Sequence, residues 1–320
     1  MLQDYQGIVA ASNIPSSTNV IKFSKGDVLL SNIRPYLKKV WYADRDGGCS
    51  ADVLVFKALS ACIPDFLHYV IANDRFINFA MSGAKGVKMP RGDKEQMKTY
   101  EIGLPSIEEQ KKIAKLLSLL DERITTQNKI IEDLKKLKCA IAERLFNVTD
   151  GDSVPLTEVC TILKGKQING EFLSEKGKYY VMNGGTEPSG YYDKSNAPAD
   201  TISISEGGNS CGYIQYNREA FWSGGHCYTL NNITPNVCKL YLYHYLKSQE
   251  SSIMKLRIGT GLPNIQKKDL EKFCILLPSK AKQESISTFL TAIESKIANE
   301  EMLQNYFLEE KLYLLRQMFI

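Results

Sequence analysis

The chain has 320 residues, and its 40 lysine and arginine residues against 36 aspartate and glutamate residues give a formal net charge of +4. This length allows about two domains, and a composition that is 43% hydrophobic and 24% charged excludes wholesale disorder. No apolar run approaches the roughly twenty residues of a membrane span, and the first residues lack the pattern of a secretory leader. We therefore expect a cytoplasmic protein.

The first domain is placed at residues 1–105 and should mix short strands with one helix. Strands are predicted at Asp27–Leu30, Lys39–Tyr42 and Asp52–Phe56, where apolar and β-branched residues dominate. A helix is predicted near Asp65–Phe79.

A long helix is predicted within residues 106–150. Ser106 is a candidate N-cap, and the acidic Glu108 and Glu109 suit the first turn of a helix. Apolar side chains then recur alternately four and three residues apart, which is typical of a coiled-coil seam. The seam positions are Ile113, Leu117, Leu120, Ile124, Gln127, Ile131, Leu134, Lys138, Ile141 and Leu145.

The second domain is placed at residues 151–278 and is richer in strands. Turns rich in glycine and asparagine separate the strands, and a short helix is expected at 239–250. The predicted strands are Tyr179–Val181, Thr201–Ile204, Tyr213–Tyr216 and Cys227–Leu230.

A second long helix is predicted in residues 279–320, and it repeats the first. Residues 89–146 align without a gap on residues 262–319, at a constant offset of 173, with 12 identities in 58 positions. Asp27 and Asp200 are related by the same offset, so we expect the same register in the strands. The second seam comprises Ile286, Leu290, Ile293, Ile297, Glu300, Gln304, Phe307, Lys311, Leu314 and Met318.

The repeat predicts an α+β fold with two copies of one domain, each followed by a long helix. Two identical faces meet best around a twofold axis, so the helices should form an antiparallel coiled coil. The alternative is two amphipathic helices that each pack only on their own domain. By the repeat register Met1 faces Ser174, so the first domain has no counterpart of Ser153–Leu173 and is expected to be incomplete at its start.

Cysteine spacing and catalytic motifs give no sign of an active site. The eight cysteines include no C-x-x-C pair, so neither a disulfide framework nor a zinc site is expected. The nearest group of metal-ligating types, Cys211, His226, Cys227 and Cys238, matches no zinc spacing. Phosphate-loop, nucleophile-elbow and adenine-methylase motifs are missing from the sequence.

The sequence resembles the specificity (S) subunits of type I restriction–modification systems. The likeness rests on Leu104–Ile113, which is similar to the family's LPxxxEQxxI entry to its long helix, and on a looser match at Leu277–Ile286. The segments Leu156–Gln167 and Gly259–Ile265 resemble parts of the family's target-recognition domain.

This resemblance implies a non-catalytic subunit that reads a bipartite DNA target, one half with each domain. It also implies two docked methyltransferase subunits, which carry S-adenosylmethionine, and restriction motor-nuclease subunits that can join them. Docking is expected at Gln110, Ile113, Gln283 and Ile286, which recur at the base of both helices. The alternative is that the two isoleucines belong to the core.

DNA contacts should come from local basic clusters, because the net charge is modest. The candidates are Arg34, Lys38, Lys85, Lys88, Arg91, Lys94, Lys164, Lys166, Asn183, Asn209, Arg257, Asn264 and Lys267. Base readout is expected from polar groups in the variable loops, namely Asn32, Arg34, Asn183, Glu206, Asn209 and Arg218. For any single lysine, a solvated basic surface is an equally good interpretation.

Two other functions are compatible with the sequence. One is a structural adaptor that binds partners through the coiled coil and binds no DNA. The other is a fused methyltransferase–specificity chain with a hidden catalytic part, which S-adenosylmethionine binding by the isolated chain would favour.

Overall fold

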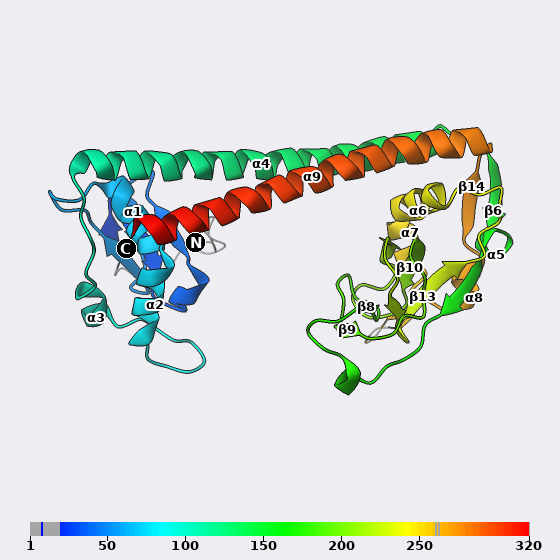
Figure 1. Ribbon diagram of the computed structural model, residues 1–320, viewed down its shortest axis with the longest axis horizontal. Coiled ribbons are helices and arrows are strands. Elements are labelled where there is room, and N and C mark those ends of the chain that lie inside the picture. The colour runs from blue at the N-terminus through cyan, green and yellow to red at the C-terminus, as the bar shows by residue number, and fades with distance from the viewer. Residues whose placement is uncertain (1–7, 9–19, 260, 262, 320) are drawn as a thin grey trace. The chain divides into compact units, whose positions relative to one another are not determined.

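The computed structural model describes residue 8 and residues 20–319, apart from residues 260 and 262. The chain forms two compact units, of which the first comprises Met1–Lys129 with Glu301–Ile320 and the second Ile130–Glu300. Each unit contains one α+β domain together with part of each long helix, α4 (Ile107–Asn147) and α9 (Lys280–Met318) (Figure 1).

The domain of the first unit is built on a three-stranded antiparallel sheet. Its central strand β2 (Val28–Ser31) lies between β3 (Val40–Tyr42) and β5 (Val53–Phe56). A separate two-stranded ribbon pairs β1 (Ile21–Phe23) with β4 (Gly47–Cys49). The helical elements are η1 (Pro35–Leu37), α1 (Pro64–Ala72), α2 (Asp74–Ser82) and α3 (Lys94–Lys98).

The domain of the second unit has a larger sheet, which is also antiparallel. Four antiparallel strands follow the order β11 (Ile214–Asn217), β10 (Thr201–Ser205), β13 (Cys227–Asn231) and β7 (Thr161–Lys164). A small sheet has the order β12 (Trp222–Ser223), β8 (Tyr179–Met182) and β9 (Tyr191–Tyr192). A strand pair joins β6 (Asp152–Pro155) to β14 (Cys274–Leu277). The helical elements are α5 (Leu156–Val159), η2 (Gly170–Phe172), α6 (Lys239–Ser248), α7 (Glu250–Met254) and α8 (Lys267–Glu271).

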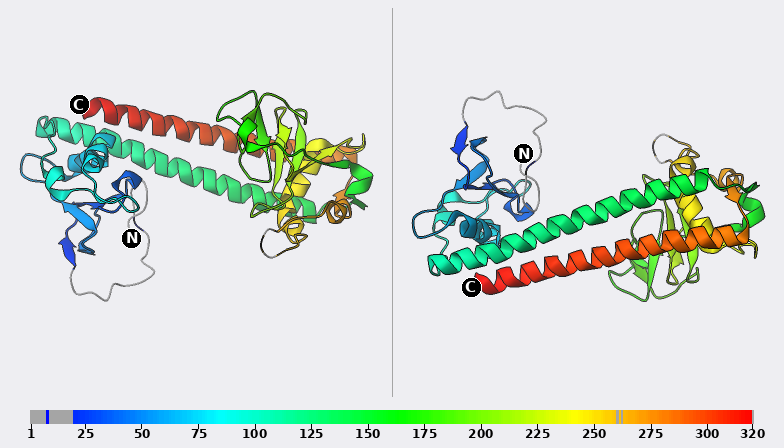
Figure 2. Two further views of the ribbon diagram at one scale, coloured as in Figure 1. Left: turned by 90° about the horizontal axis from the view of Figure 1, so that it is seen from below. Right: turned by 90° about the horizontal axis from the view of Figure 1, so that it is seen from above.

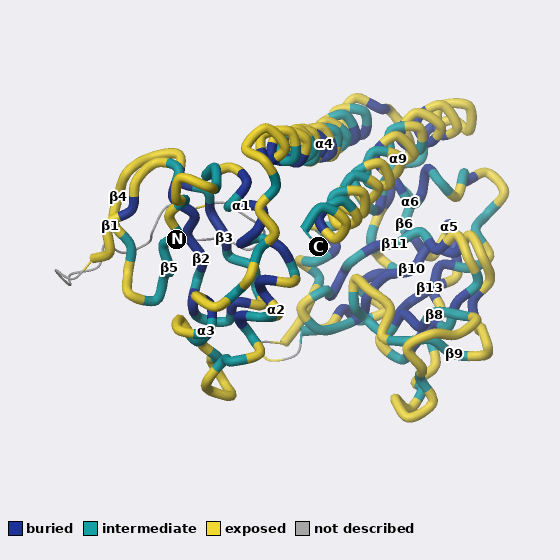
Figure 3. Tube along the Cα trace, turned by 60° about the vertical axis from the view of Figure 1, so that its left-hand side comes forward, coloured by how far each residue is buried: buried dark blue, intermediate teal, exposed yellow. Residues whose placement is uncertain are grey.

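Each domain has its own apolar core. Figure 3 shows that buried residues are concentrated along the strands of the main sheets. In the first unit, Val28 and Leu30 of β2 pack with Phe76 of α2. In the second unit, Ile202 and Ile204 of β10 occupy the equivalent place and are fully buried. Both strands have neighbours on each side and are largely buried, but β10 alternates isoleucine with the buried polar residues Thr201, Ser203 and Ser205.

The repeat predicted from the sequence is present, but its register shifts by one position in the sheets. Helices α3 and α8 keep the predicted offset of 173. The sheet pair Val28↔Tyr42, however, corresponds to Ile202↔Tyr216, which is an offset of 174. The expectation that Asp27 and Asp200 mark the same register in the strands is therefore wrong. The first unit has one extra residue between its sheet and α3.

The two long helices pack antiparallel in both units (Figure 2). In the first unit, Leu117 of α4 shares an apolar cluster with Leu315 of α9. In the second unit, Phe146 of α4 shares one with Ile286 and Leu290 of α9. All predicted seam positions are buried or half-buried, including the polar ones. Antiparallel packing of the helices along this seam is confirmed within each unit.

In each unit, a carboxylate on one long helix binds a tyrosine of the domain and a lysine of the other long helix. We call this group of three side chains the polar joint. In the first unit, the Tyr69 hydroxyl on α1 donates to Asp121 on α4 at 3.0 Å, and Lys311 on α9 forms an ion pair with the same carboxylate. Because one carboxylate accepts from both a domain and the opposite helix, sliding either helix by a turn would leave buried polar groups without partners.

The second joint has the same construction. Tyr243 on α6 donates to Glu294 on α9 at 3.1 Å, and Lys138 on α4 pairs with that carboxylate. The repeat register aligns Asp121 with Glu294 and Lys138 with Lys311, so the two joints are related by the repeat. Each lysine is a seam position that breaks the apolar pattern. These two breaks therefore mark where the domains attach.

A large-to-small substitution in the seam tests how much the helix packing contributes. Leu117→Ala should lower the free energy of unfolding by about 3 kcal/mol, because Leu117 is fully buried and its loss leaves a cavity. The neighbouring Leu116 is 40% exposed, so Leu116→Ala should change the free energy of unfolding by no more than about 0.5 kcal/mol. Urea titration of both variants gives the comparison. Equal effects would show that the seam is not a packed interface.

Two buried histidines should make the fold sensitive to mild acid. Burial lowers the pKa of His68 and of His244 from 6.5 to about 4, so both stay neutral in the folded protein while the unfolded chain binds protons below pH 6.5. The free energy of unfolding that depends on these neutral histidines is fully present above pH 6.5, and it is lost as the pH falls toward 4. Between pH 7 and pH 5, each histidine should lower the free energy of unfolding by about 2 kcal/mol.

The measurement is the free energy of unfolding at both pH values for the wild type and for His244→Gln. The variant should lose less stability on acidification than the wild type. His226→Gln is the matched control, because the His226 side chain is 62% exposed. A variant with the full wild-type dependence on pH would contradict the assignment to His244.

Candidate nucleic-acid interface

The first unit presents a basic hairpin loop beyond the end of its central strand. The backbones of Lys85 and Arg91 pair with each other at 2.9 and 3.0 Å, and the loop between them carries Lys88. Gly86 has a φ of +97°, which a residue with a side chain rarely adopts, so glycine permits this turn. The side chains of Lys85, Lys88 and Arg91 are exposed, as is that of Lys94 at the start of α3.

Arg34 connects this hairpin to the sheet. Its backbone N–H donates to the carbonyl of Pro90 at 2.8 Å, and its guanidinium donates to the carbonyl of Lys88 at 3.1 Å. Both Arg34 and Lys38 have a left-handed backbone, with φ values of 51° and 49°. Such strained positions persist where the surroundings fix them and are common at functional sites.

Acidic neighbours offset part of the positive charge. Lys85 lies 3.1 Å from Asp93, and Arg91 lies 3.2 Å from Asp52. Lys38 pairs with Asp74 and is only half-exposed. These ion pairs partly neutralise the basic side chains. Because they are exposed, they contribute little to the free energy of unfolding.

The second unit has an equivalent hairpin at 258–264. Ile258 and Asn264 pair at 2.8 and 3.0 Å, and Gly259 has a φ of +94° at the position equivalent to Gly86. Gly208 donates to the Pro263 carbonyl at 3.0 Å, as Arg34 does to Pro90. Thr260 and Leu262 of this predicted loop lie outside the described residues. The hairpin is flanked by basic or amide side chains, of which Arg257, Asn264 and Lys267 are exposed.

Beside the second hairpin, three loops pack backbone against backbone. We call this group, which comprises 164–167, 183–185 and 223–226, the glycine loop cluster. A Cβ on Gly165 would lie 2.2 Å from the Gly224 carbonyl oxygen, and one on Gly224 would lie 2.5 Å from Asn183 Oδ1. Glycine is therefore required for the close approach of these loops. The cluster brings Lys164, Lys166 and Asn183 together.

A buried carboxylate holds the glycine loop cluster to the sheet. Glu206 accepts from Lys164 at 2.6 Å and from the Tyr228 hydroxyl at 2.9 Å, and its other oxygen lies 3.6 Å from His226 Nδ1. Burial and the hydrogen bond to Glu206 raise the pKa of Tyr228. With its carboxylate engaged in this way, Glu206 positions Lys164, and its role as a base reader stays a prediction.

The other residues predicted to contact DNA differ in orientation, in burial and in their position on the sheet. Asn183 directs its side-chain oxygen inward to the His226 N–H at 3.1 Å, and Lys166 accepts a hydrogen bond from Trp222 on its backbone carbonyl at 2.9 Å. Asn209 is exposed near Glu206 in the chain. Asn32 is only 5% exposed. Arg218 follows the Thr201↔Asn217 end of the β10–β11 pair, which is the opposite end from Glu206.

The expected docking residues are mostly inside the protein. Gln110 accepts from the Ile63 N–H at 2.9 Å and donates to the carbonyls of Ala61 and Pro105 at 2.9 and 3.0 Å. Gln283 accepts from the Cys238 N–H at 2.8 Å and donates to the carbonyls of Asn236 and Pro278 at 3.2 and 2.8 Å.

We call these two glutamines the glutamine clamps, because each ties the start of a domain helix to the start of a long helix. Ile63 is the N-cap of α1 and Cys238 is the N-cap of α6. Gln110 and Gln283 are 0% and 1% exposed, Ile286 is buried and Ile113 is half-buried. A docking role for these four residues stays a prediction. The exposed neighbours Lys112 and Lys115 are accessible to a partner.

Among the described residues, no group of three or more His, Cys, Asp or Glu side chains is placed to hold a metal ion. None of the helices in this part of the chain is both long and apolar enough to cross a membrane.

A family model for the type I restriction modification DNA specificity domain matches residues 4–136 and 150–306. A putative type I specificity subunit of Mycoplasma genitalium is 36% identical over 138 residues, which cover 42% of this chain and 36% of that protein. The putative type I restriction enzyme MjaX specificity subunit of Methanocaldococcus jannaschii is 27% identical over 269 residues, covering 73% of this chain and 62% of that protein. The chain thus spans less than two thirds of these relatives.

Solved structures with the same fold agree with this match. The crystal structure of the S subunit of a type I restriction–modification system from M. genitalium superposes with a TM-score of 0.68 at 20% identity, covering 100% of this chain and 88% of that one. A chain from a structural study of the assembly and conformational transition of a type I system gives a TM-score of 0.61 at 21% identity, with 94% and 84% covered.

Proposed function

Because this chain belongs to the family of type I restriction–modification specificity subunits, we propose that it reads a bipartite DNA target as the non-catalytic subunit of such a complex. One observation carries the proposal. Both units have an equivalent hairpin, 85–91 and 258–264, beyond the same end of β2 and of β10. Exposed basic side chains lie within the first hairpin and flank the second, at Arg257 and Lys267. A repeated reader suits a target with two half-sites.

The chemistry of the two hairpins supports contact with DNA. Exposed lysine and arginine side chains attract phosphates, and the glycine at each turn lets the backbone approach closely. The exposed amide and guanidinium groups of Asn209, Arg257 and Asn264 can donate to base edges in the major groove. Local charge of this kind supplies binding that a net charge of +4 alone would not.

The partners follow from the proposed role. Two methyltransferase subunits would dock on the helix pair, and restriction motor-nuclease subunits could join them in the cytoplasm. The methyltransferases would flip and methylate adenine with their own S-adenosylmethionine. This chain would supply recognition and spacing. The relation of the two joints by the repeat supports two equivalent docking places.

A second candidate is an adaptor that binds partners through the helix pair and binds no DNA. The main sheet of the first unit favours this function, because among the described residues it has three strands, whereas that of the second unit has four. The two functions differ in a measurable way, because phosphate contacts weaken steeply with salt.

Reversal of one hairpin charge should weaken DNA binding. We expect Lys88→Glu to lower affinity for a genomic DNA fragment about tenfold at moderate salt and to reduce the slope of log K against log salt by about one. Lys111→Glu is the control, because Lys111 is exposed on α4 and pairs with Glu108 at 2.9 Å. Fluorescence anisotropy over a salt series measures both. Absence of DNA binding by the wild type even at low salt would favour the adaptor.

Docking of methyltransferase subunits should depend on the exposed turn beside the glutamine clamp. The double charge reversal Lys112→Glu with Lys115→Glu should reduce co-purification of the methyltransferase while leaving the melting temperature within a few degrees. Arg45→Glu, at a side chain 66% exposed in the domain, serves as the control. Equal recovery of the partner with the double variant would rule out this docking surface.

The length of the helices should set the gap between the half-sites. Deleting Gln127–Asp133 together with Glu300–Tyr306 removes one heptad from each helix and keeps the seam in phase. A heptad of helix is about 10.5 Å, so the gap should shorten by up to about three base pairs while the half-site letters stay the same. Sites selected from a library with randomised spacers show the gap. Recovery of the original gap with full affinity would contradict the role as a ruler.

A further inference from the structure

The second unit contains a strand–helix–strand segment, 152–164, that closes two edges of its domain. Strand β6 pairs with β14 from Asp152↔Leu277 to Pro155↔Cys274, and the Leu156 N–H donates to the Phe273 carbonyl at 3.0 Å. Helix α5 contributes Leu156 and Val159 to the core, and β7 then pairs with β13 as the fourth strand of the main sheet. This single segment therefore covers both β14 and β13.

In the first unit the counterpart of β14 has no such cover in the described part of the chain. By the repeat register, Glu101–Leu104 corresponds to Cys274–Leu277, and it belongs to no strand among the described residues. Ile102 is half-buried where Ile275 is 1% exposed, and Leu104 is 46% exposed where Leu277 is half-buried against the core. These residues are more open to solvent than their covered counterparts.

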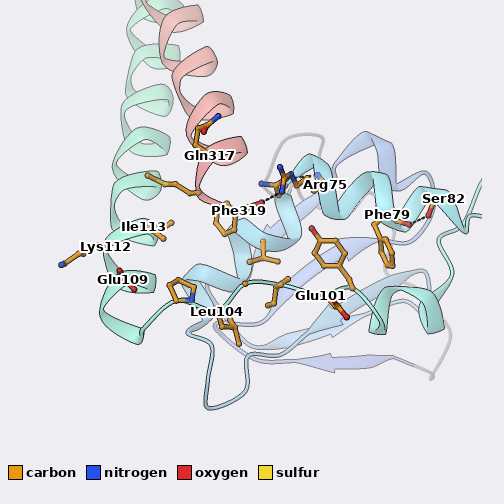
Figure 4. Close-up of a pocket in the computed structure, with 17 residues that line it drawn as sticks. Arg75, Phe79, Ser82, Glu101, Leu104, Glu109, Lys112, Ile113, Gln317 and Phe319 are labelled. Atoms are coloured by element: carbon orange, nitrogen blue, oxygen red, sulfur yellow. Dashed lines mark hydrogen bonds between the residues drawn. The ribbon is translucent and has the colours of Figure 1, made fainter.

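A cleft of about 1050 Å³ runs along this uncovered segment (Figure 4). Tyr100, Ile102 and Leu104 line one side, and Met318 and Phe319 at the end of α9 line another. The end of α9 in the first unit corresponds by the repeat to the end of α4 in the second. There α4 ends at Asn147 and β6 begins only a few residues later, at Asp152. The cleft therefore lies where a strand lies in the other unit.

The counterpart of β13 is open as well. Strand β5 has β2 on one side, and the described part of the chain adds no strand on its other side. All four residues of β5 are half-buried, whereas the first four of β13 are buried. An open strand edge offers unpaired backbone N–H and C=O groups to an added strand.

We propose that these two open edges form one docking site for a strand–helix–strand segment of another polypeptide. The occupant would have the chemistry of 152–164, with an extended start, a short helix and apolar anchors like Leu156, Val159 and Ile162. Each of those anchors is at most 2% exposed in its own unit. The chain's own segment cannot serve, because it is paired with β13 and β14.

Main-chain pairing gives the site its affinity, and the apolar anchors give it selectivity. In the docked complex, Glu101–Leu104 pairs with the first strand of the segment in the register of β14 with β6. The second strand pairs with β5. Leu104 and Ile102 become buried, as their counterparts are.

The test titrates the full chain into a fluorescent peptide with the sequence of residues 150–165, carrying Cys160→Ser to prevent oxidation. We expect saturable binding of one peptide per chain. Leu104→Asp in the chain should weaken it at least about tenfold, because the leucine must be buried on docking. Leu119→Asp is the matched control, since Leu119 is 47% exposed on α4 and Leu104 is 46% exposed. A peptide with Leu156→Asp and Ile162→Asp should bind as weakly as the wild-type peptide binds the Leu104 variant.

Circular dichroism confirms that each variant is folded before binding is measured. Two results would overturn the proposal: no saturable binding by the folded wild type, or equal binding by the Leu104 and Leu119 variants. The source of the segment is tested by the intact mass of the chain purified from its own cells. The mass of the printed sequence supports a separate polypeptide, whereas a longer chain that carries the segment contradicts it.

Discussion

The structure depends on carboxylates that accept hydrogen bonds from a domain and from the opposite long helix at once. Asp121 does this in the first unit and Glu294 in the second, each with one tyrosine and one lysine as partners. An apolar seam alone would allow the antiparallel helices to slip by a heptad, because each heptad resembles the next. Slippage here would leave a largely buried lysine and carboxylate unpaired, which is strongly unfavourable. The joints thus fix register and domain attachment together.

This arrangement separates the framework from the loops that we propose to contact DNA. The glutamine clamps and the joints lie at the helices, and they tie down α1 and α6 by backbone and buried side-chain contacts. The two hairpins and the glycine loop cluster instead lie beyond the ends of the sheet strands. Loops can therefore differ between the units, as 85–91 and 258–264 do in sequence, without disturbing the framework. Such independence suits the proposed role, because binding loops on a rigid framework can vary without unfolding it.

Much of the framework could be predicted from the sequence, because long-range repetition and a heptad pattern are strong signals. The extents of α4 and α9 and their antiparallel packing followed from them. The joints could not be found in this way. Tyr69 and Tyr243 differ by an offset of 174, so an alignment at a constant offset of 173 places Tyr69 opposite Leu242. The repetition of Gln110 and Gln283 is visible in the sequence but suggests a partner site, because sequence does not reveal that a polar side chain is buried against backbone groups.

The proposed role in recognition is tested most directly in the host by sequencing methylated adenines across the genome, with and without this gene. The account predicts one bipartite motif that is methylated in the wild type and unmethylated in the deletion strain. Restoring the gene should restore methylation at the same motif. Identical methylation in the presence and absence of the gene, with the partner methyltransferase expressed in both, would contradict the account.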